Sequence, residues 1–379
     1  MLMKKYKLSE AKKVIIKLGS GIITNDGKGL DEICLQNIVK QICKFNKDMQ
    51  VVIVSSGAIA AGLKRLEIKQ RPKQLCELQA AAAVGQMDLI QIYQKLFSNE
   101  GELSAQILLT HNDLSDRERY LNARSTLNNL LEKNVIPVIN ENDSIANEEI
   151  KFGDNDNLAA LTANLIEADF LILLTDQVGL FSDDPRTNKE SVLIDHAFAD
   201  DERLDLLAHD TFSSVGSGGM KTKILAARRA ALSGTHTIIA NGKQKDILDK
   251  LIKNDVPHTF LESPSTKLLA RKNWLAGQLK AKGIVYVDQG AADAIVKTGK
   301  SLLSIGVERV SGEFARGALV ECQNPRGEII AKGLVNYSSK ELVKIMGHPS
   351  DKIEQLIGYI NEKSLIHRNN LVVFKRDNK

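Results

Sequence analysis

The sequence predicts an α/β protein: a three-layer αβα sandwich around a mainly parallel sheet, followed by a small, mostly-β, barrel-like domain. In the first two-thirds of the chain, short runs of Val, Ile and Leu alternate with helical patterns. These runs are continuously apolar, as in strands that are buried on both faces of a parallel sheet. Towards the C-terminus the pattern changes to short β-type runs separated by turns. Alternating strands and helices followed by such runs indicate two domains of different architecture.

Six apolar runs are the expected strands of the large sheet. Most of them end in Gly, Ser, Thr or Asn, and they cover 14–19, 51–57, 107–110, 135–140, 170–175 and 237–240. A helical spacing of apolar residues follows the first run, with Asp31 as the expected N-cap. The same spacing recurs over 89–96 and 120–131. Each helix therefore connects one strand of the sheet to the next.

The last part of the chain is expected to form a separate domain. Its β-type runs cover 284–288, 318–322 and 328–337, and Asn324-Pro325-Arg326-Gly327 is a strong turn signal between the last two. The charges of residues 1–280 balance, so the whole net charge of +4 arises from the residues after them. We expect a first domain over 1–262, a connecting region over 263–280, a second domain over 281–360 and a tail over 361–379.

The composition excludes several classes of protein. With 43% hydrophobic and 26% charged residues, the chain is globular rather than disordered or fibrous. The longest uncharged run, 49–63, is shorter than the ~20 apolar residues that a membrane span needs, and no secretory signal is expected. The four cysteines lack zinc or disulfide spacing, which predicts a cytoplasmic protein. The small number of aromatic residues and the low net positive charge argue against a nucleic acid partner.

Polar clusters follow several of the apolar runs, at the strand ends where open α/β sheets bind ligands. Lys17 lies inside an apolar run and precedes Gly19-Ser20-Gly21, so the ammonium and the nearby backbone N–H groups are expected to face a phosphate. The alternative is a lysine that reaches solvent beside an ordinary turn. Ser55-Ser56-Gly57 ends the next strand and opens a helix, an arrangement that can bind an anion or simply cap the helix.

Two clusters rich in carboxylates and amides come next, at 140–143 and 153–157. Carboxylates suit an ammonium and amides suit a carboxylate, so the clusters fit a small zwitterion. Ordinary turns with an N-cap are the alternative, and a calcium loop lacks its EF-hand spacing. No residue is expected to bind a metal ion directly.

The glycine-rich segment 216–223 precedes the helical stretch ILAARRAAL and contains two lysines. Its composition suits a phosphate cradle, although it is neither a Walker A loop nor a dinucleotide fingerprint. A flexible surface loop is the alternative. Together the clusters predict phosphoryl transfer without a nucleophilic side chain, in which two lysines neutralise the transferring group. The acidic stretch 141–210 would repel bare phosphates, so Mg²⁺ would have to accompany them.

Seven motifs, in this order and spacing, closely resemble the amino acid kinase family: KLGSG, VSSGAIAAG, VINEND, KFGDNDNLAAL, LLTDQVGL, DDPR and SGGMKTK. The resemblance extends over residues 12–360, and the C-terminal module is similar to a PUA domain. VINEND with GDNDN resembles the branch that acts on glutamate, rather than on aspartate, acetylglutamate, carbamate or UMP.

The resemblance implies an enzyme that uses ATP and Mg²⁺ to phosphorylate the γ-carboxylate of L-glutamate. It also implies the first step of proline biosynthesis, feedback inhibition by proline and a homo-oligomer, either dimer or tetramer. A kinase for another small acid and an RNA-binding protein stay open as alternatives. The attacking carboxylate is already ionised at neutral pH, so no general base is needed.

The resemblance further implies roles for single residues. Lys17 and Lys223 would stabilise the phosphoryl group in flight, and Asp156 would organise both lysines. The positions that match substrate binding are Ser56, Asp143 and Asn155. The positions that match nucleotide binding are Lys17, Gly19, Thr175, Asp176, Ser217, Gly218, Gly219, Met220, Lys221, Thr222 and Lys223.

Overall fold

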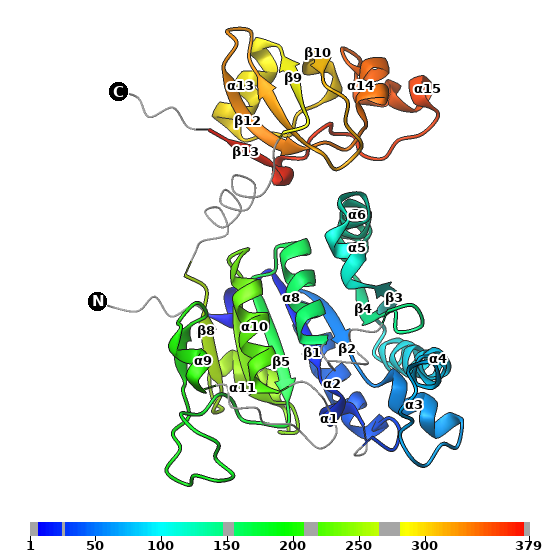
Figure 1. Cartoon of the computed structure of the whole chain (residues 1–379), viewed down its shortest axis with the longest axis vertical. Coiled ribbons are helices and arrows are strands. Elements are labelled where there is room, and N and C mark those ends of the chain that lie inside the picture. The colour runs from blue at the N-terminus through cyan, green and yellow to red at the C-terminus, as the bar shows by residue number, and fades with distance from the viewer. Residues whose placement is uncertain (1–6, 25–26, 147–154, 208–218, 265–280, 375–379) are drawn as a thin grey trace. The chain divides into compact units, whose positions relative to one another are not determined.

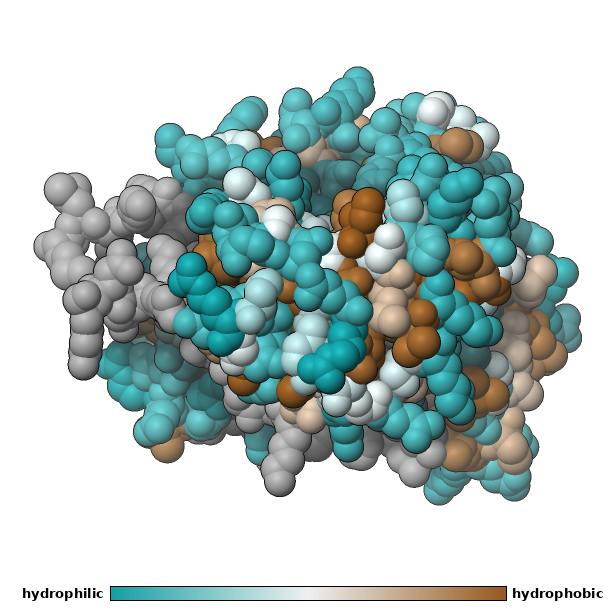
Figure 2. Space-filling view, turned by 90° about the horizontal axis from the view of Figure 1, so that it is seen from above, coloured by the Kyte–Doolittle hydropathy of each residue, from teal (hydrophilic) through white to brown (hydrophobic). Residues whose placement is uncertain are grey.

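The computed structural model describes residues 7–24, 27–146, 155–207, 219–264 and 281–374. These residues form two compact units, one drawn from 1–114 and 123–270 and the other from 115–122 and 271–379. Figure 1 shows the elements of both units. The surface in Figure 2 is mainly hydrophilic, as the composition predicts. No helix of the described residues is long and apolar enough to cross a membrane.

The first unit is built on an eight-stranded sheet with the order β3-β4-β2-β1-β5-β7-β8-β6. Its strands are β1 (Lys13–Leu18), β2 (Gln50–Ser55), β3 (Leu103–Leu109), β4 (Val135–Glu141), β5 (Phe170–Thr175), β6 (His196–Phe198), β7 (His236–Asn241) and β8 (Thr259–Glu262). All neighbours pair in parallel except β7 and β8. The predicted α/β class with a mainly parallel sheet is confirmed. The short strands β6 and β8 were not predicted.

The helices of this unit lie between the strands, as the alternating pattern predicts. They are α1 (Ser20–Ile23), α2 (Glu32–Phe45), α3 (Ala58–Arg65), α4 (Leu75–Asn99), α5 (His111–Ser115), α6 (Arg117–Glu132), α8 (Asn155–Ile166), α9 (Arg203–Leu207), α10 (Met220–Ala231) and α11 (Ile247–Lys253). The first part of α6, up to residue 122, is assigned to the second unit. At the start of α2 the Asp31 carboxylate accepts a hydrogen bond from Cys34 N at 3.0 Å, which confirms the predicted N-cap.

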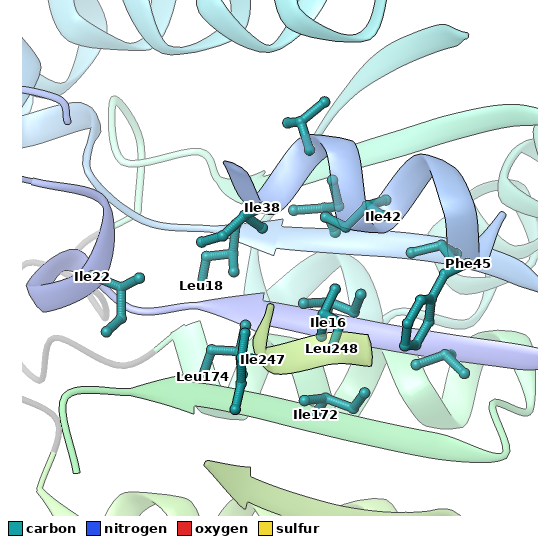
Figure 3. Packing of buried hydrophobic residues seen from close by; sticks show 14 of the residues in the cluster. Ile16, Leu18, Ile22, Ile38, Ile42, Phe45, Ile172, Leu174, Ile247 and Leu248 are labelled. Carbon is teal, nitrogen blue, oxygen red and sulfur yellow. The ribbon is translucent and has the colours of Figure 1, made fainter. Parts of the chain in front are cut away.

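The packing of the core shows which face of the sheet each side chain of the central strand β1 points to. Ile16 and Leu18 of β1 pack with residues of β5, α2 and α11 on one face of the sheet (Figure 3). Because side chains alternate between the two faces of a strand, Ile15 and Lys17 point to the opposite face. Helix α8 packs on that opposite face, beside α10 (Figure 1). The sheet and its two helical layers therefore direct Lys17 towards α8.

The second unit has its own five-stranded sheet with the order β10-β9-β11-β12-β13. The strands are β9 (Gly283–Val287), β10 (Val307–Ser311), β11 (Leu319–Gln323), β12 (Ile329–Leu334) and β13 (Leu371–Val373), and the helices are α13 (Gln289–Thr298), α14 (Ser339–Ile345) and α15 (Ile353–Ile357). The predicted turn joins β11 to β12, where Gly327 N donates to Asn324 O at 3.0 Å. A separate apolar cluster fills the interior of this unit.

Candidate active site

Three charged side chains meet between the sheet and the helices α8 and α10. Lys17 Nζ lies 2.5 Å from Asp156 Oδ1, and Lys223 Nζ lies 3.1 Å from Asp156 Oδ2. The exposed fractions are 5%, 0% and 5% for Lys17, Asp156 and Lys223, so all three charges are buried. The structure thus brings together three residues from distant parts of the sequence. One carboxylate faces two ammonium groups, which leaves this trio with a net charge of +1.

The surroundings of Asp156 keep it ionised. Burial alone raises the pKa of this carboxyl, but the charges of Lys17 and Lys223 and their hydrogen bonds lower it by more. The net result is a pKa well below the ordinary value. Asp156 therefore carries a full negative charge at neutral pH, and it can hold both lysines in place.

The first turns of α8 and α10 lie next to each other at this cluster. Thr222 Oγ1 lies 2.8 Å from Gly219 O and 3.1 Å from Asp156 Oδ2. Towards the other ends of the same helices, Asn164 Nδ2 donates to Arg229 O at 3.0 Å. The two helices thus run side by side in the same direction, and the positive ends of both dipoles face the lysines. The two helix N-termini and the lysines together favour an anionic ligand.

Helix α10 begins earlier in the glycine-rich segment than the sequence predicts. The helix begins at Met220 rather than near Ile224, with Gly219 as its N-cap. Lys221 is exposed and Lys223 is buried, because two residues along a helix turn the side chain by about 200°. The predicted nucleotide-binding residues Ser217 and Gly218 lie outside the described residues.

The polar residues at the carboxyl ends of β2 and β4 form a second, uncharged cluster with Asn155. Asn155, the first residue of α8, donates from Nδ2 to Ser55 O at 2.8 Å, to Asn140 Oδ1 at 2.9 Å and to Ser56 Oγ at 3.1 Å. Asn140 Nδ2 in turn donates to Gln86 Oε1 at 2.8 Å. Asn155 Oδ1 is buried and accepts no hydrogen bond from any residue that the structure describes. It is an acceptor available to a ligand.

Tyr93 supports this second cluster from the core. Its hydroxyl lies 2.9 Å from Ser55 Oγ, which donates to Ser56 O at 3.0 Å. Burial raises the pKa of the Tyr93 phenol, and the hydrogen bond with Ser55 offsets this only in part. The phenol therefore keeps its proton. Because the Ser55 hydroxyl donates to Ser56 O, the Tyr93 hydroxyl is the donor to Ser55 Oγ. Asp143 is buried in the turn that follows β4, three residues beyond Asn140.

The remaining predicted nucleotide positions lie at the ends of β1 and β5. Gly19 is the N-cap of α1, and a Cβ built on it would lie 3.7 Å from Lys17 Nζ. Thr175 Oγ1 donates to Asp176 Oδ1 at 3.1 Å. A Cβ on Gly21 would lie 4.0 Å from the Asp176 carboxylate. The first glycine motif and the end of β5 are therefore neighbours, although they are more than 150 residues apart in the sequence.

The sequence placed Asn140 in a polar cluster but gave it no role of its own, and it did not single out Gln86 or Tyr93. Asn140 belongs to the VINEND motif, so its position at the end of an apolar run was a usable signal. Gln86 and Tyr93 lie in the long helix α4 and carry no such signal. Only the packing of α4 against the sheet reveals their hydrogen bonds. Among the described residues, no group of three or more His, Cys, Asp or Glu side chains is placed to hold a metal ion.

Comparisons with known proteins cover both units. The model of the amino acid kinase family matches residues 12–241, and that of the PUA domain matches residues 283–357. Glutamate 5-kinase of Nitrosospira multiformis is 52% identical over 367 residues, which is 97% of this chain and 99% of that protein. Glutamate 5-kinase of Methylobacillus flagellatus has the same identity and coverage. Glutamate 5-kinase of Methylococcus capsulatus is 52% identical over 97% of this chain and 98% of its own length.

Proposed function

The chain belongs to the amino acid kinase family, and from this premise we propose that it transfers the γ-phosphoryl group of ATP to the γ-carboxylate of L-glutamate. The relatives at about half identity over nearly their whole length carry the name glutamate 5-kinase. The observation that carries the proposal is the buried trio of Lys17, Asp156 and Lys223. It concentrates positive charge beside two helix N-termini and contains no nucleophile, as phosphoryl transfer between two bound substrates requires.

In the proposed reaction, an oxygen of the substrate carboxylate attacks the γ-phosphorus. A new O–P bond forms, the bond to the oxygen bridging the β- and γ-phosphates breaks, and ADP leaves with γ-glutamyl phosphate as the other product. Lys17 and Lys223 neutralise charge on the transferring group, and Asp156 fixes their positions. The attacking carboxylate is ionised at neutral pH, so proton removal is not part of the step.

The uncharged cluster together with Asp143 is the proposed amino acid subsite. Ser56, Asp143 and Asn155 would bind L-glutamate, with hydroxyl and amide groups for its carboxylate and oxygen atoms for its ammonium. Proline also carries a carboxylate and an ammonium, so inhibition by proline fits the same kind of subsite. This activity would be the first step of proline biosynthesis.

The nucleotide would lie across the ends of β1 and β5 and the start of α10. The residues proposed to contact it are Lys17, Gly19, Thr175, Asp176 and the segment from Ser217 to Lys223. Mg²⁺ enters as part of the MgATP substrate, since this ion usually binds through phosphate oxygens and a few waters. We further propose a kinase domain over 1–262, a connecting region over 263–280, a PUA domain over 281–360, a tail over 361–379 and a homo-oligomeric assembly.

The test is an ADP-release assay with MgATP and one of three acceptors: L-glutamate, L-aspartate or N-acetylglutamate. We expect release with L-glutamate only, and less release when proline is added. The same panel separates the proposal from its nearest rival, a kinase for another small acid, which would prefer a different acceptor. Absence of ADP release with L-glutamate would overturn the proposal.

A further inference from the structure

The direction of every hydrogen bond in the uncharged cluster follows from one backbone carbonyl. Ser55 O can only accept, so the Asn155 group that faces it at 2.8 Å must be the NH₂ group. A rotated Asn155 amide would bring two oxygens together. The Asn155 carbonyl oxygen therefore points away from Ser55, and it accepts no hydrogen bond from the described residues.

The orientation of Asn155 also determines the hydrogen bonds that lead outward to helix α4. Because Asn155 presents NH₂, Asn140 must offer its oxygen to it, at 2.9 Å. The NH₂ group of Asn140 then faces Gln86 and requires an acceptor there, which Gln86 Oε1 provides at 2.8 Å. The three amides thus form a chain of hydrogen bonds, here called the relay, in which each bond can be donated in one direction only. We call this direction the sense of the relay. Gln86, which is half-buried, closes the outer end of this relay.

The relay also determines what Ser56 can offer to a ligand. Ser56 Oγ lies 3.1 Å from the Asn155 NH₂ group and can only accept there. Its hydroxyl proton is therefore directed elsewhere. Of these two residues, Ser56 presents a donor, its hydroxyl, and Asn155 presents an acceptor, Oδ1. A carboxylate matches the donor and an ammonium matches the acceptor, which is the pair of groups that an amino acid carries.

We propose that Gln86 is a positioning residue that determines specificity for an α-amino acid, because it accepts the outer hydrogen bond of the Gln86–Asn140–Asn155 relay and so holds the Asn140 amide in the orientation that Ser55 O sets. It acts through Asn140 and does not touch the substrate. This inference rests on the proposed function, since it takes L-glutamate as the ligand of Ser56 and Asn155. Without an acceptor at position 86, the NH₂ group of Asn140 loses its hydrogen bond to Gln86, and the Asn140 amide, which accepts from Asn155, is held less firmly.

The experiment compares three variants of the full chain. Gln86→Leu removes the acceptor, Gln86→Glu keeps an acceptor oxygen, and Gln94→Leu makes the same change at an exposed position of α4. The measurements are KM for L-glutamate, KM for ATP, and the ratio of kcat/KM for L-glutamate to that for glutarate, which lacks the ammonium. A general loss of folding would lower the apparent kcat for every substrate and leave both KM values and this ratio unchanged.

For Gln86→Leu we expect KM for L-glutamate to rise about tenfold, as the loss of one buried hydrogen bond implies. KM for ATP should stay near the wild-type value, and the preference for L-glutamate over glutarate should narrow. Gln86→Glu and Gln94→Leu should resemble the wild type. The inference is overturned if Gln86→Leu keeps the wild-type KM and preference, or if Gln86→Glu is as impaired as Gln86→Leu. A wild-type chain without activity on L-glutamate would instead refute the proposed function.

Discussion

At the scale of single residues, the buried trio is unusual because one lysine can be removed without leaving an uncompensated carboxylate. Lys223→Met leaves Lys17 and Asp156 as a neutral ion pair at 2.5 Å. We expect kcat to fall by about 100-fold or more, as for the loss of an electrostatic stabiliser, while the free energy of unfolding changes by about 1 kcal/mol at most. Steady-state kinetics and urea unfolding measure the two quantities. Lys40→Met, on the exposed face of α2, is the matched control. Normal turnover of Lys223→Met would contradict the proposed mechanism.

The opposite substitution, Asp156→Asn, should destabilise the fold in a pH-dependent way. It removes the carboxylate that lies within 3.1 Å of both buried ammonium groups, at a cost of about 3–5 kcal/mol at neutral pH. Since the folded chain lowers the pKa of Asp156, the unfolded chain binds the proton first as the pH falls.

The stabilising effect of Asp156 is therefore complete above about pH 5 and decreases below the unfolded pKa of about 4. Urea unfolding of the wild type and Asp156→Asn at several pH values should show a gap that is constant near neutrality and narrows in acid. A gap that widened in acid would mean that the carboxyl is protonated in the folded chain.

The sequence identified the charged residues of the site more completely than the uncharged ones. Lys17 is conspicuous in an apolar run, and Lys223 and Asp156 lie in dense polar motifs. Gln86 and Tyr93 belong to an ordinary helical pattern, where a glutamine or tyrosine has no local reason to be noticed. Their function depends on which strand end the helix faces, and this is a property of packing rather than of spacing.

At the scale of elements, helices α3 and α4 cross so closely that their glycines have no room for a side chain. A Cβ on Gly62 would lie 1.7 Å from Ala81 O, and one on Gly85 would lie 1.9 Å from Ala58 O. Ala58 is the first residue of α3, directly after Ser56 and Gly57 of the proposed subsite. This crossing therefore links the position of α4, with Gln86, to the start of α3.

We expect Gly62→Ala to lower the free energy of unfolding by about 1–3 kcal/mol, because the two helices must move apart. Helix propensity alone predicts the opposite sign, a gain of about 1 kcal/mol. Gly290→Ala is the control, since this glycine of α13 has no atom closer than 3.3 Å to the added Cβ. Urea unfolding distinguishes the two signs, and a stabilised Gly62→Ala would refute the close crossing.

The elements that the sequence predicted best are those with a clear pattern of apolar residues. The apolar runs at 14–19, 51–57 and 170–175 agree with β1, β2 and β5 to within two residues. The strands β6 and β8 are three and four residues long and pair at the edge of the sheet, so their sequences carry too few apolar positions to form a pattern. Helix α10 begins four residues early because Gly219 caps it, although the glycines before Met220 indicated a loop.

At the scale of the whole molecule, the two units have separate apolar interiors and separate sheets. The change of sequence pattern towards the C-terminus predicted that the chain divides into an α/β part and a mostly-β part. All the described residues of the proposed site belong to the first unit. Ligands of the site therefore act directly on the stability of that unit alone.

This separation predicts two unfolding transitions in calorimetry of the full chain, because units with independent cores do not unfold as one. The unfolding enthalpy scales with the number of residues, so the larger transition belongs to the first unit. L-Glutamate with MgADP binds the folded site without turnover, and we expect it to raise the midpoint of the larger transition only. Aspartate with MgADP is the control, and its effect should be smaller. A shift of the smaller transition, or one transition that moves as a whole, would show that the units are energetically coupled.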